Sequence, residues 1–170
     1  MDFRPIANIV LVTPEIPQNT GNVIRLCANV GAQLHLVKPL GFELENRGLR
    51  RASLDYSDLT NISVHNSVDE LFEGVSMDRV YGATIPGDVL YTTPRYEQGD
   101  TIVFGPESVG LPDMFVNRLN NMNRIQIPMV SGNRSLNISN AAAIIVYEVW
   151  RQIGFIGASD TVGENQLHFT

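Results

Sequence analysis

Arg134-Ser135-Leu136-Asn137-Ile138-Ser139-Asn140 is the stretch that most constrains the fold and function of this chain. It follows a strand-like run, 124–127, and opens a mostly apolar run, 136–153, that is typical of a helix. One Ser or Asn would suffice to cap the unpaired N–H groups of a helix N-terminus. The surplus of hydrogen-bonding side chains here indicates a ligand site, and plain capping is the alternative.

Two further loops have the same character. Residues 14–22, Pro-Glu-Ile-Pro-Gln-Asn-Thr-Gly-Asn, lie between a predicted strand and a predicted helix that Asn19 or Thr20 can cap. Residues 104–112, Phe-Gly-Pro-Glu-Ser-Val-Gly-Leu-Pro, follow another strand. In that loop Gly105 permits close approach of a ligand and Gly110 permits a positive φ. Because all three loops follow strands, a parallel sheet would bring them to one edge, where ligands bind.

The charges expected in this pocket are Glu107, Arg25 and Arg134. Asn22, Arg25 and Asn29 share one polar helix face, and no carboxylate lies three or four residues from Arg25. An arginine without a local partner is a candidate ligand for phosphate or sugar, and a solvated surface arginine is the alternative.

The predicted elements alternate between strands and helices, which is typical of an α/β fold with a mainly parallel sheet and helices on both faces. The predicted strands cover 7–13, 34–37, 62–65, 80–83, 101–104 and 124–127. The predicted helices cover 19–30, 45–53, 67–72, 112–119 and 136–153, and 158–170 is expected to be a tail.

The composition bounds the class of protein. A chain of 170 residues that is 44% hydrophobic suits one domain. The single cysteine, Cys27, weakly favours a reducing compartment, and the apolar run 6–12 is too short to span a membrane. We therefore expect a cytoplasmic protein without a membrane partner. The three histidines lack metal-ligand spacing, and no Walker A or dinucleotide fingerprint is present, so no metal is expected.

The net charge of −6 is unusual for a protein that binds nucleic acid. Arg47, Arg50 and Arg51 form a local basic cluster that could still do so, and a solvated helix face is the alternative.

The last predicted helix is apolar over most of its circumference. One apolar stripe runs from Ile138 to Ile153, and a second contains Ala143, Tyr147 and Trp150. Such a helix is buried on more than one side, and in so small a domain a second copy is the expected partner. An ordinary central helix is the alternative.

In order and spacing the three loops resemble the motifs of the SPOUT superfamily of RNA methyltransferases. The matching stretches are 14–25, 104–107, and 127–129 followed by 134–140, and the resemblance runs from about Ile9 to Gly157. Within the superfamily the chain resembles the small single-domain group that methylates the ribose 2′-oxygen at the tRNA wobble nucleotide, cytidine or uridine. The resemblance implies one SPOUT domain over 1–157 with a C-terminal trefoil knot. Sequence periodicity alone could not have predicted the knot, because knots are nearly absent from proteins.

The resemblance also implies a site. The donor would be S-adenosylmethionine, and its contacts would fall at Ala83, Gly105, Ile127 and Ser135, with Thr84, Glu107, Met129 and Leu136 close by. Arg25 would be the catalytic group. Family members are dimers whose site spans the interface, and Tyr147 would lie near it. The RNA-binding residues would be Arg25, Arg47, Arg50, Arg51, Arg134 and Tyr147.

The expected substrate is the anticodon stem-loop of tRNA, because a minimal domain suits a compact target. Two alternatives stay open. One is the same chemistry on ribosomal RNA, and the other is a non-catalytic module that binds a nucleotide or RNA.

Overall fold

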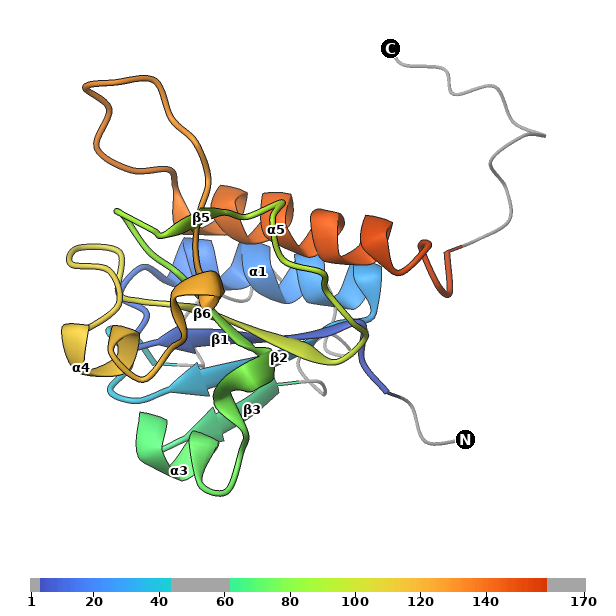
Figure 1. The fold of residues 1–170 in the computed structure, drawn as a ribbon. Helices are drawn as coiled ribbons and strands as arrows, with labels where there is room; N and C mark the ends of the chain where they lie inside the picture. The colour runs from blue at the N-terminus through green and yellow to red at the C-terminus, as the bar shows by residue number, and fades with distance from the viewer. Residues whose placement is uncertain (1–3, 44–61, 159–170) are drawn as a thin grey trace, which may run out of the picture.

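Seven parallel strands form one sheet in the order β3-β2-β1-β6-β4-β7-β5 in the computed structural model, which describes residues 4–43 and 62–158 (Figure 1). The strands are β1 (Ala7–Val12), β2 (Gln33–Val37), β3 (Ile62–His65), β4 (Val80–Ala83), β5 (Val89–Leu90), β6 (Asp100–Phe104) and β7 (Arg124–Gln126). The α-helices are α1 (Pro17–Val30), α3 (Val68–Phe72), α4 (Asp113–Val116) and α5 (Ile138–Gln152). Two short 3-10 helices, η2 (Met77–Arg79) and η3 (Asn121–Asn123), lead into β4 and β7.

Strand β1 shows why the sheet is covered on both faces. Its side chains alternate, so Ile9 and Leu11 enter one apolar cluster while Val10 and Val12 enter another. Both sets are buried. A strand that is buried on both sides reads as a continuous apolar run, which is what the sequence of β1 is.

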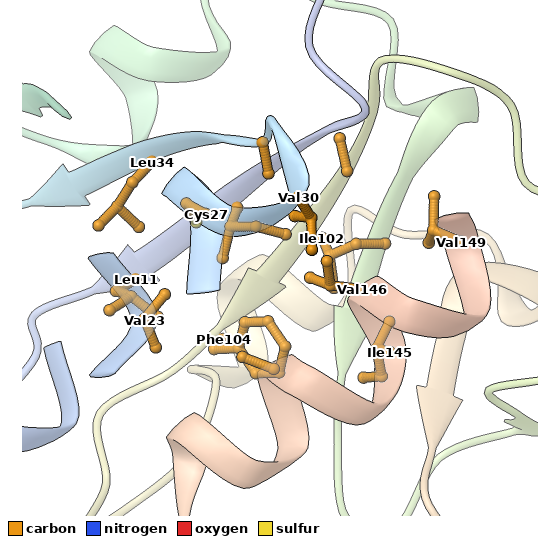
Figure 2. Close-up of a cluster of buried hydrophobic side chains, with 14 of the residues drawn as sticks. Leu11, Val23, Cys27, Val30, Leu34, Ile102, Phe104, Ile145, Val146 and Val149 are labelled. Carbon is orange, nitrogen blue, oxygen red and sulfur yellow. The ribbon is translucent and has the colours of Figure 1, made fainter. Parts of the chain in front are cut away.

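Helices α1 and α5 lie side by side on one face of the sheet (Figure 1). Figure 2 shows the cluster beneath them, to which Val23 and Cys27 of α1 and Ile145 and Val149 of α5 belong. Helix α1 ends at Gly31, whose φ of 75° is left-handed and whose N–H donates to the Cys27 carbonyl.

The opposite face is covered by α3 and α4. Phe72 of α3 and Phe115 of α4 are buried there with ring centroids 5.5 Å apart. Helix α3 is capped by Ser67, whose hydroxyl accepts from the Glu70 N–H at 3.1 Å. The helices therefore lie on both faces, and the predicted α/β class is confirmed.

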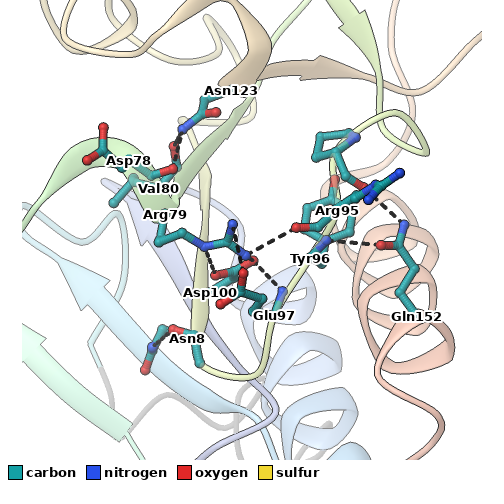
Figure 3. A network of polar contacts seen from close by, with 12 residues as sticks. Asn8, Asp78, Arg79, Val80, Arg95, Tyr96, Glu97, Asp100, Asn123 and Gln152 are labelled. Atoms are coloured by element: carbon teal, nitrogen blue, oxygen red, sulfur yellow. Dashed lines mark hydrogen bonds and ion pairs between the residues drawn. The ribbon is translucent and has the colours of Figure 1, made fainter.

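A polar network ties the segment before β6 to both the sheet and α5 (Figure 3). Arg79 donates to the two carboxylate oxygens of Asp100 at 2.8 and 2.6 Å. Burial raises the pKa of Asp100, and the hydrogen bonds from Arg79 oppose that shift. At the other end of the network, Gln152 of α5 accepts from the Tyr96 N–H at 3.0 Å and donates to the Pro94 carbonyl at 3.2 Å. The network fixes β6, from which one loop of the site departs.

Two elements differ from those predicted from the sequence. The strand β5 was not predicted, since two residues carry no periodicity. The predicted helix 112–119 shrinks to α4, because the chain turns at Asn117 to bury Leu119. The predicted helix 45–53 and the tail beyond 158 lie outside the described residues, and the knot stays a prediction. Among the described residues, none of the helices has the length and apolar character needed to cross a membrane.

Candidate active site

A cavity of about 900 Å³ opens at the carboxyl edge of β4, β6 and β7. Residues of all three predicted loops line it, so the loops do converge. The lining also includes every residue predicted to lie at the donor: Ala83, Thr84, Gly105, Glu107, Ile127, Met129, Ser135 and Leu136. Their role as donor contacts stays a prediction.

The loop after β6 closes on itself very tightly. A Cβ on Gly105 would lie 2.1 Å from the Gly110 carbonyl carbon and 2.2 Å from the Leu111 nitrogen. Gly110 has a φ of 73°, and its N–H donates to the Pro106 carbonyl at 2.9 Å. The chain can make this turn only because both positions are glycine.

The loop after β7 enters α5 through Asn137. Its side-chain oxygen accepts from the N–H groups of Ser139 at 2.9 Å and Asn140 at 3.4 Å, which caps the helix. Its amide nitrogen donates to Asn19 of the first loop at 2.9 Å. One residue therefore caps α5 and joins two loops, so the predicted surplus of polar groups serves more than capping.

The start of α1 differs from the prediction. The helix begins at Pro17, with Ile16 at the N-cap and no side-chain cap from its own loop. Asn19 and Thr20 are buried in the first turn, so the expectation that one of them caps the helix is wrong. The N–H groups of Glu15 and Ile16 are instead satisfied by the Glu107 carboxylate, at 2.8 and 3.2 Å.

The cavity suits a ligand that is part apolar and part polar. Leu111, Ile125 and Ile138 are apolar residues of its lining. The Thr84 hydroxyl is buried there without a hydrogen-bond partner. The polar residues of the cavity lining include Ser108, Ser135 and Asn137. The purine, ribose and methionine parts of S-adenosylmethionine match this mixture.

The predicted charges of the pocket are only partly found there. Glu107 and Arg134 line the cavity, but Arg25 does not. Arg25 is exposed on α1, nine residues beyond Ile16, which is roughly 13 Å along the helix axis. Its side chain makes no hydrogen bond or ion pair with the part of the chain that the structure describes. Within one chain, Arg25 therefore does not reach the cavity, and its catalytic role stays a prediction.

The other residues predicted to bind RNA fall into two groups. Arg47, Arg50 and Arg51 lie outside the described residues. Tyr147 is 48% exposed on α5, with its ring against Trp150 at 5.7 Å.

Asp113 is a lining residue that the sequence reasoning missed. It is exposed and forms no ion pair within residues 4–43 and 62–158. The available signal was its place at the start of a helix that follows a strand and a glycine-rich loop.

Other chemistries find little support. In the described part of the chain no group of three His, Cys, Asp or Glu side chains could hold a metal ion. Burial raises the pKa of Cys27 to about 12, which leaves a poor nucleophile. His35 and His65 contact each other at 3.0 Å between β2 and β3 and are not among the residues that line the cavity.

Known proteins resemble the chain over most of its length. The model of the SpoU rRNA Methylase family matches residues 7–147. A tRNA (cytidine(34)-2'-O)-methyltransferase of Methylovorus glucosotrophus is 48% identical, over 89% of this chain and 98% of that protein. The Escherichia coli protein of the same name is 45% identical, over 89% and 96%.

Among solved structures, one that concerns the 2-OH methylation of C/U34 on tRNA is 39% identical. It superposes with a TM-score of 0.79 over 86% of this chain and 90% of its own. Fold, motif order and sequence identity agree, and the chain belongs to the SpoU methylase family.

Proposed function

We propose that this chain transfers a methyl group from S-adenosylmethionine to the ribose 2′-oxygen of the tRNA wobble nucleotide, cytidine or uridine at position 34. Relatives with 45–48% identity over 89% of the chain are named for that reaction on cytidine 34. One observation carries the proposal: the three motif-bearing loops meet at a single cavity with the size and mixed polarity of the donor. Residues 1–157 are proposed to form the one methyltransferase domain of the chain.

The donor is proposed to lie against Ala83, Gly105, Ile127 and Ser135, where it supplies an electrophilic methyl on a sulfonium. Thr84, Glu107, Met129 and Leu136 are proposed to lie close by, since they line the same cavity. The tight turn at Gly105 leaves backbone rather than side chain facing the cavity, which suits a purine held by main-chain groups.

Arg25 is proposed to act on the acceptor. A guanidinium stays protonated in proteins, so it is a poor base near neutral pH. It can instead bind the phosphate next to the target ribose and stabilise the negative charge that develops on the 2′-oxygen, while that phosphate or water takes the proton. We expect Arg25→Ala to lose turnover far more than donor affinity. Normal turnover in that variant would remove Arg25 from the mechanism.

A homodimer is proposed to bring Arg25 of one copy to the cavity of the other. In one chain, Tyr147 of the second apolar stripe of α5 and the adjacent Ile144 remain exposed, at 48% and 37%. Helices α1 and α5 lie side by side, so a second copy bound on α5 would lie close to the helix that carries Arg25 (Figure 1). A two-fold pairing through this stripe would bury it in both copies.

Mixing two inactive variants tests this arrangement. Arg25→Ala keeps an intact cavity, whereas Gly105→Ala keeps an intact Arg25. If the site is shared, a refolded one-to-one mixture should regain about a quarter of wild-type activity, because half the dimers are mixed and each holds one complete site. Recovery would be absent if every site used a single chain. Light scattering on Tyr147→Glu, which should be monomeric, provides the matching measurement of assembly.

The substrate is tested with purified protein, S-adenosylmethionine and unmodified tRNA, followed by nucleoside mass spectrometry of the anticodon. A 2′-O-methyl at position 34 is the expected product. Ribosomal RNA fragments are assayed in parallel, since the family name refers to rRNA. Methyl transfer to those alone would favour the rRNA alternative, and no transfer with intact donor binding would favour a non-catalytic module.

Arg47, Arg50 and Arg51 are proposed to hold the anticodon stem by charge, and Arg134 to contact phosphate near the cavity. Binding of tRNA should then weaken as salt rises, with a log–log slope near −0.9 per phosphate contact on duplex. Replacing all three clustered arginines by alanine should flatten that slope. An unchanged slope would exclude this cluster from binding.

A further inference from the structure

Glu107 lines the cavity, but its carboxylate is occupied by another part of the chain. Oε2 accepts from the Glu15 N–H at 2.8 Å, and Oε1 accepts from the Ile16 N–H at 3.2 Å and the Asn19 side-chain amide at 3.2 Å. The first turn of α1 lacks both a side-chain cap from its own loop and any acidic residue. Glu107 therefore supplies, from about 90 residues away, the acceptor and negative charge that a helix start prefers.

The contact is reciprocal. The Glu15 carboxylate accepts from the Ser108 N–H at 2.8 Å and from the Ser108 hydroxyl at 2.8 Å. Each glutamate thus holds the backbone beside the other, and the first and second loops are clasped in both directions. Hydrogen bonds to a charged acceptor are the stronger kind, so the clasp resists sliding of one loop on the other.

Asn19 extends the clasp to the third loop. Its side chain is 6% exposed, donates to Glu107 and accepts from the Asn137 amide at 2.9 Å. Since Asn137 also caps α5, one buried amide connects the starts of α1 and α5 with the loop after β6. Flipping or removing that amide would leave buried partners unsatisfied, which is costly.

We propose that Glu107 and Asn19 are positioning residues, which set the direction of α1 and with it the place of Arg25 relative to the donor cavity of the other copy. This inference rests on the proposed function. Arg25 lies roughly 13 Å along a rigid helix from the clasp, so a tilt of about 5° would displace its guanidinium by about 1 Å. An error of that size at a reacting centre can cost about 10²-fold in rate. Glu107 thus acts through Arg25 and does not hold the donor.

A double-mutant cycle tests the assignment. Glu107→Gln keeps the shape of the side chain but places an NH₂ where an acceptor is needed. We expect its kcat to fall at least about 30-fold, with donor affinity within about threefold of wild type. Because the loss operates through Arg25, adding Glu107→Gln to Arg25→Ala should cost no further activity. A loss of donor affinity above tenfold, or a fully additive double variant, would overturn the proposal.

A charge exchange provides the rescue. Asn19→Asp alone sets two carboxylates against each other and should be as slow as Glu107→Gln. In the double variant, which combines Glu107→Gln with Asn19→Asp, the amide at position 107 can donate to the carboxylate at position 19. That carboxylate still accepts from Asn137. The pair should therefore recover at least about tenfold in kcat over either single variant. Failure of the pair to recover in a protein with wild-type Tm would contradict the clasp.

Hydrogen exchange separates this inference from the proposed function, since it needs no RNA. In Glu107→Gln the amides of Glu15, Ile16 and the first turn of α1 should exchange at least about tenfold faster, while those in the middle of α5 stay unchanged. Unchanged exchange at α1 would refute the clasp even if the wild type methylates tRNA. An inactive wild type that shows the faster exchange would refute only the proposed reaction.

Discussion

Replacing Gly105 by alanine should weaken donor binding strongly while the protein still folds. The added Cβ would lie 2.1 Å from the Gly110 carbonyl carbon, about 1.3 Å short of the 3.4 Å at which ordinary contact begins. The neighbours at 2.1–2.3 Å are all backbone atoms, so no side-chain rotation relieves the overlap and the loop must shift by about an ångström. Overpacking of this kind costs about 1–3 kcal/mol.

The cost should appear mainly as lost affinity, because the loop is the wall of the cavity. If the complex with the donor is destabilised by about 2–3 kcal/mol, Kd for S-adenosylmethionine rises roughly 30- to 140-fold. Isothermal titration measures this, with the melting temperature recorded on the same samples. Gly132→Ala is the control: its φ of 90° makes alanine strained, but no atom lies within 4 Å of the added Cβ. Wild-type affinity in Gly105→Ala would refute the placement of the donor against this loop.

Three further predictions concern stability. Ile145→Ala, at a fully buried position between α5 and the sheet, should lower the free energy of unfolding by about 2–5 kcal/mol in urea titrations. Asp100→Ala should cost about 2–4 kcal/mol by the same measurement, since it removes the buried carboxylate that accepts two hydrogen bonds from Arg79. Arg79 keeps the Arg95 carbonyl and Glu97 as partners and its side chain is 40% exposed, which limits the loss. Burial, with a smaller contribution from nearby His65, lowers the pKa of His35 from 6.5 to about 4. The unfolded state therefore binds more protons between these values, and the free energy of unfolding should fall by up to about 3 kcal/mol as pH drops from 6.5 to 4. His35→Gln should lack that part of the fall.

The strands could be read from the sequence because each is a short run of β-branched and apolar residues that ends at a polar loop. β3 and β4 match their predicted bounds, and β1 and β6 differ by one residue at one end. The convergence of the three loops followed from parallel strands alone. The short strand β5 could not be found, because pairing with β7 and not local sequence defines it.

The side-chain partners of the site were beyond sequence reasoning. Nothing local to Glu107 indicates that its acceptors serve a helix start about 90 residues earlier. Asn19 looked like a cap because Asn is common there, yet Pro17 begins the helix first and buries Asn19 in its opening turn. The distance between Arg25 and the cavity likewise depends on the direction of α1, which no periodicity encodes.

The order of strands has a consequence for synthesis on the ribosome. β6 pairs with β1 in the middle of the sheet, but roughly 60 residues separate it from β2, the other neighbour of β1. At about 5–20 residues per second, a nascent chain would wait about 3–12 s with one edge of β1 unpaired. Such an edge is a template for aggregation. Slower initiation of translation at low temperature should therefore raise the yield of folded protein more than a stronger promoter does. An excess of a chaperone that binds unfolded chains should have the same effect.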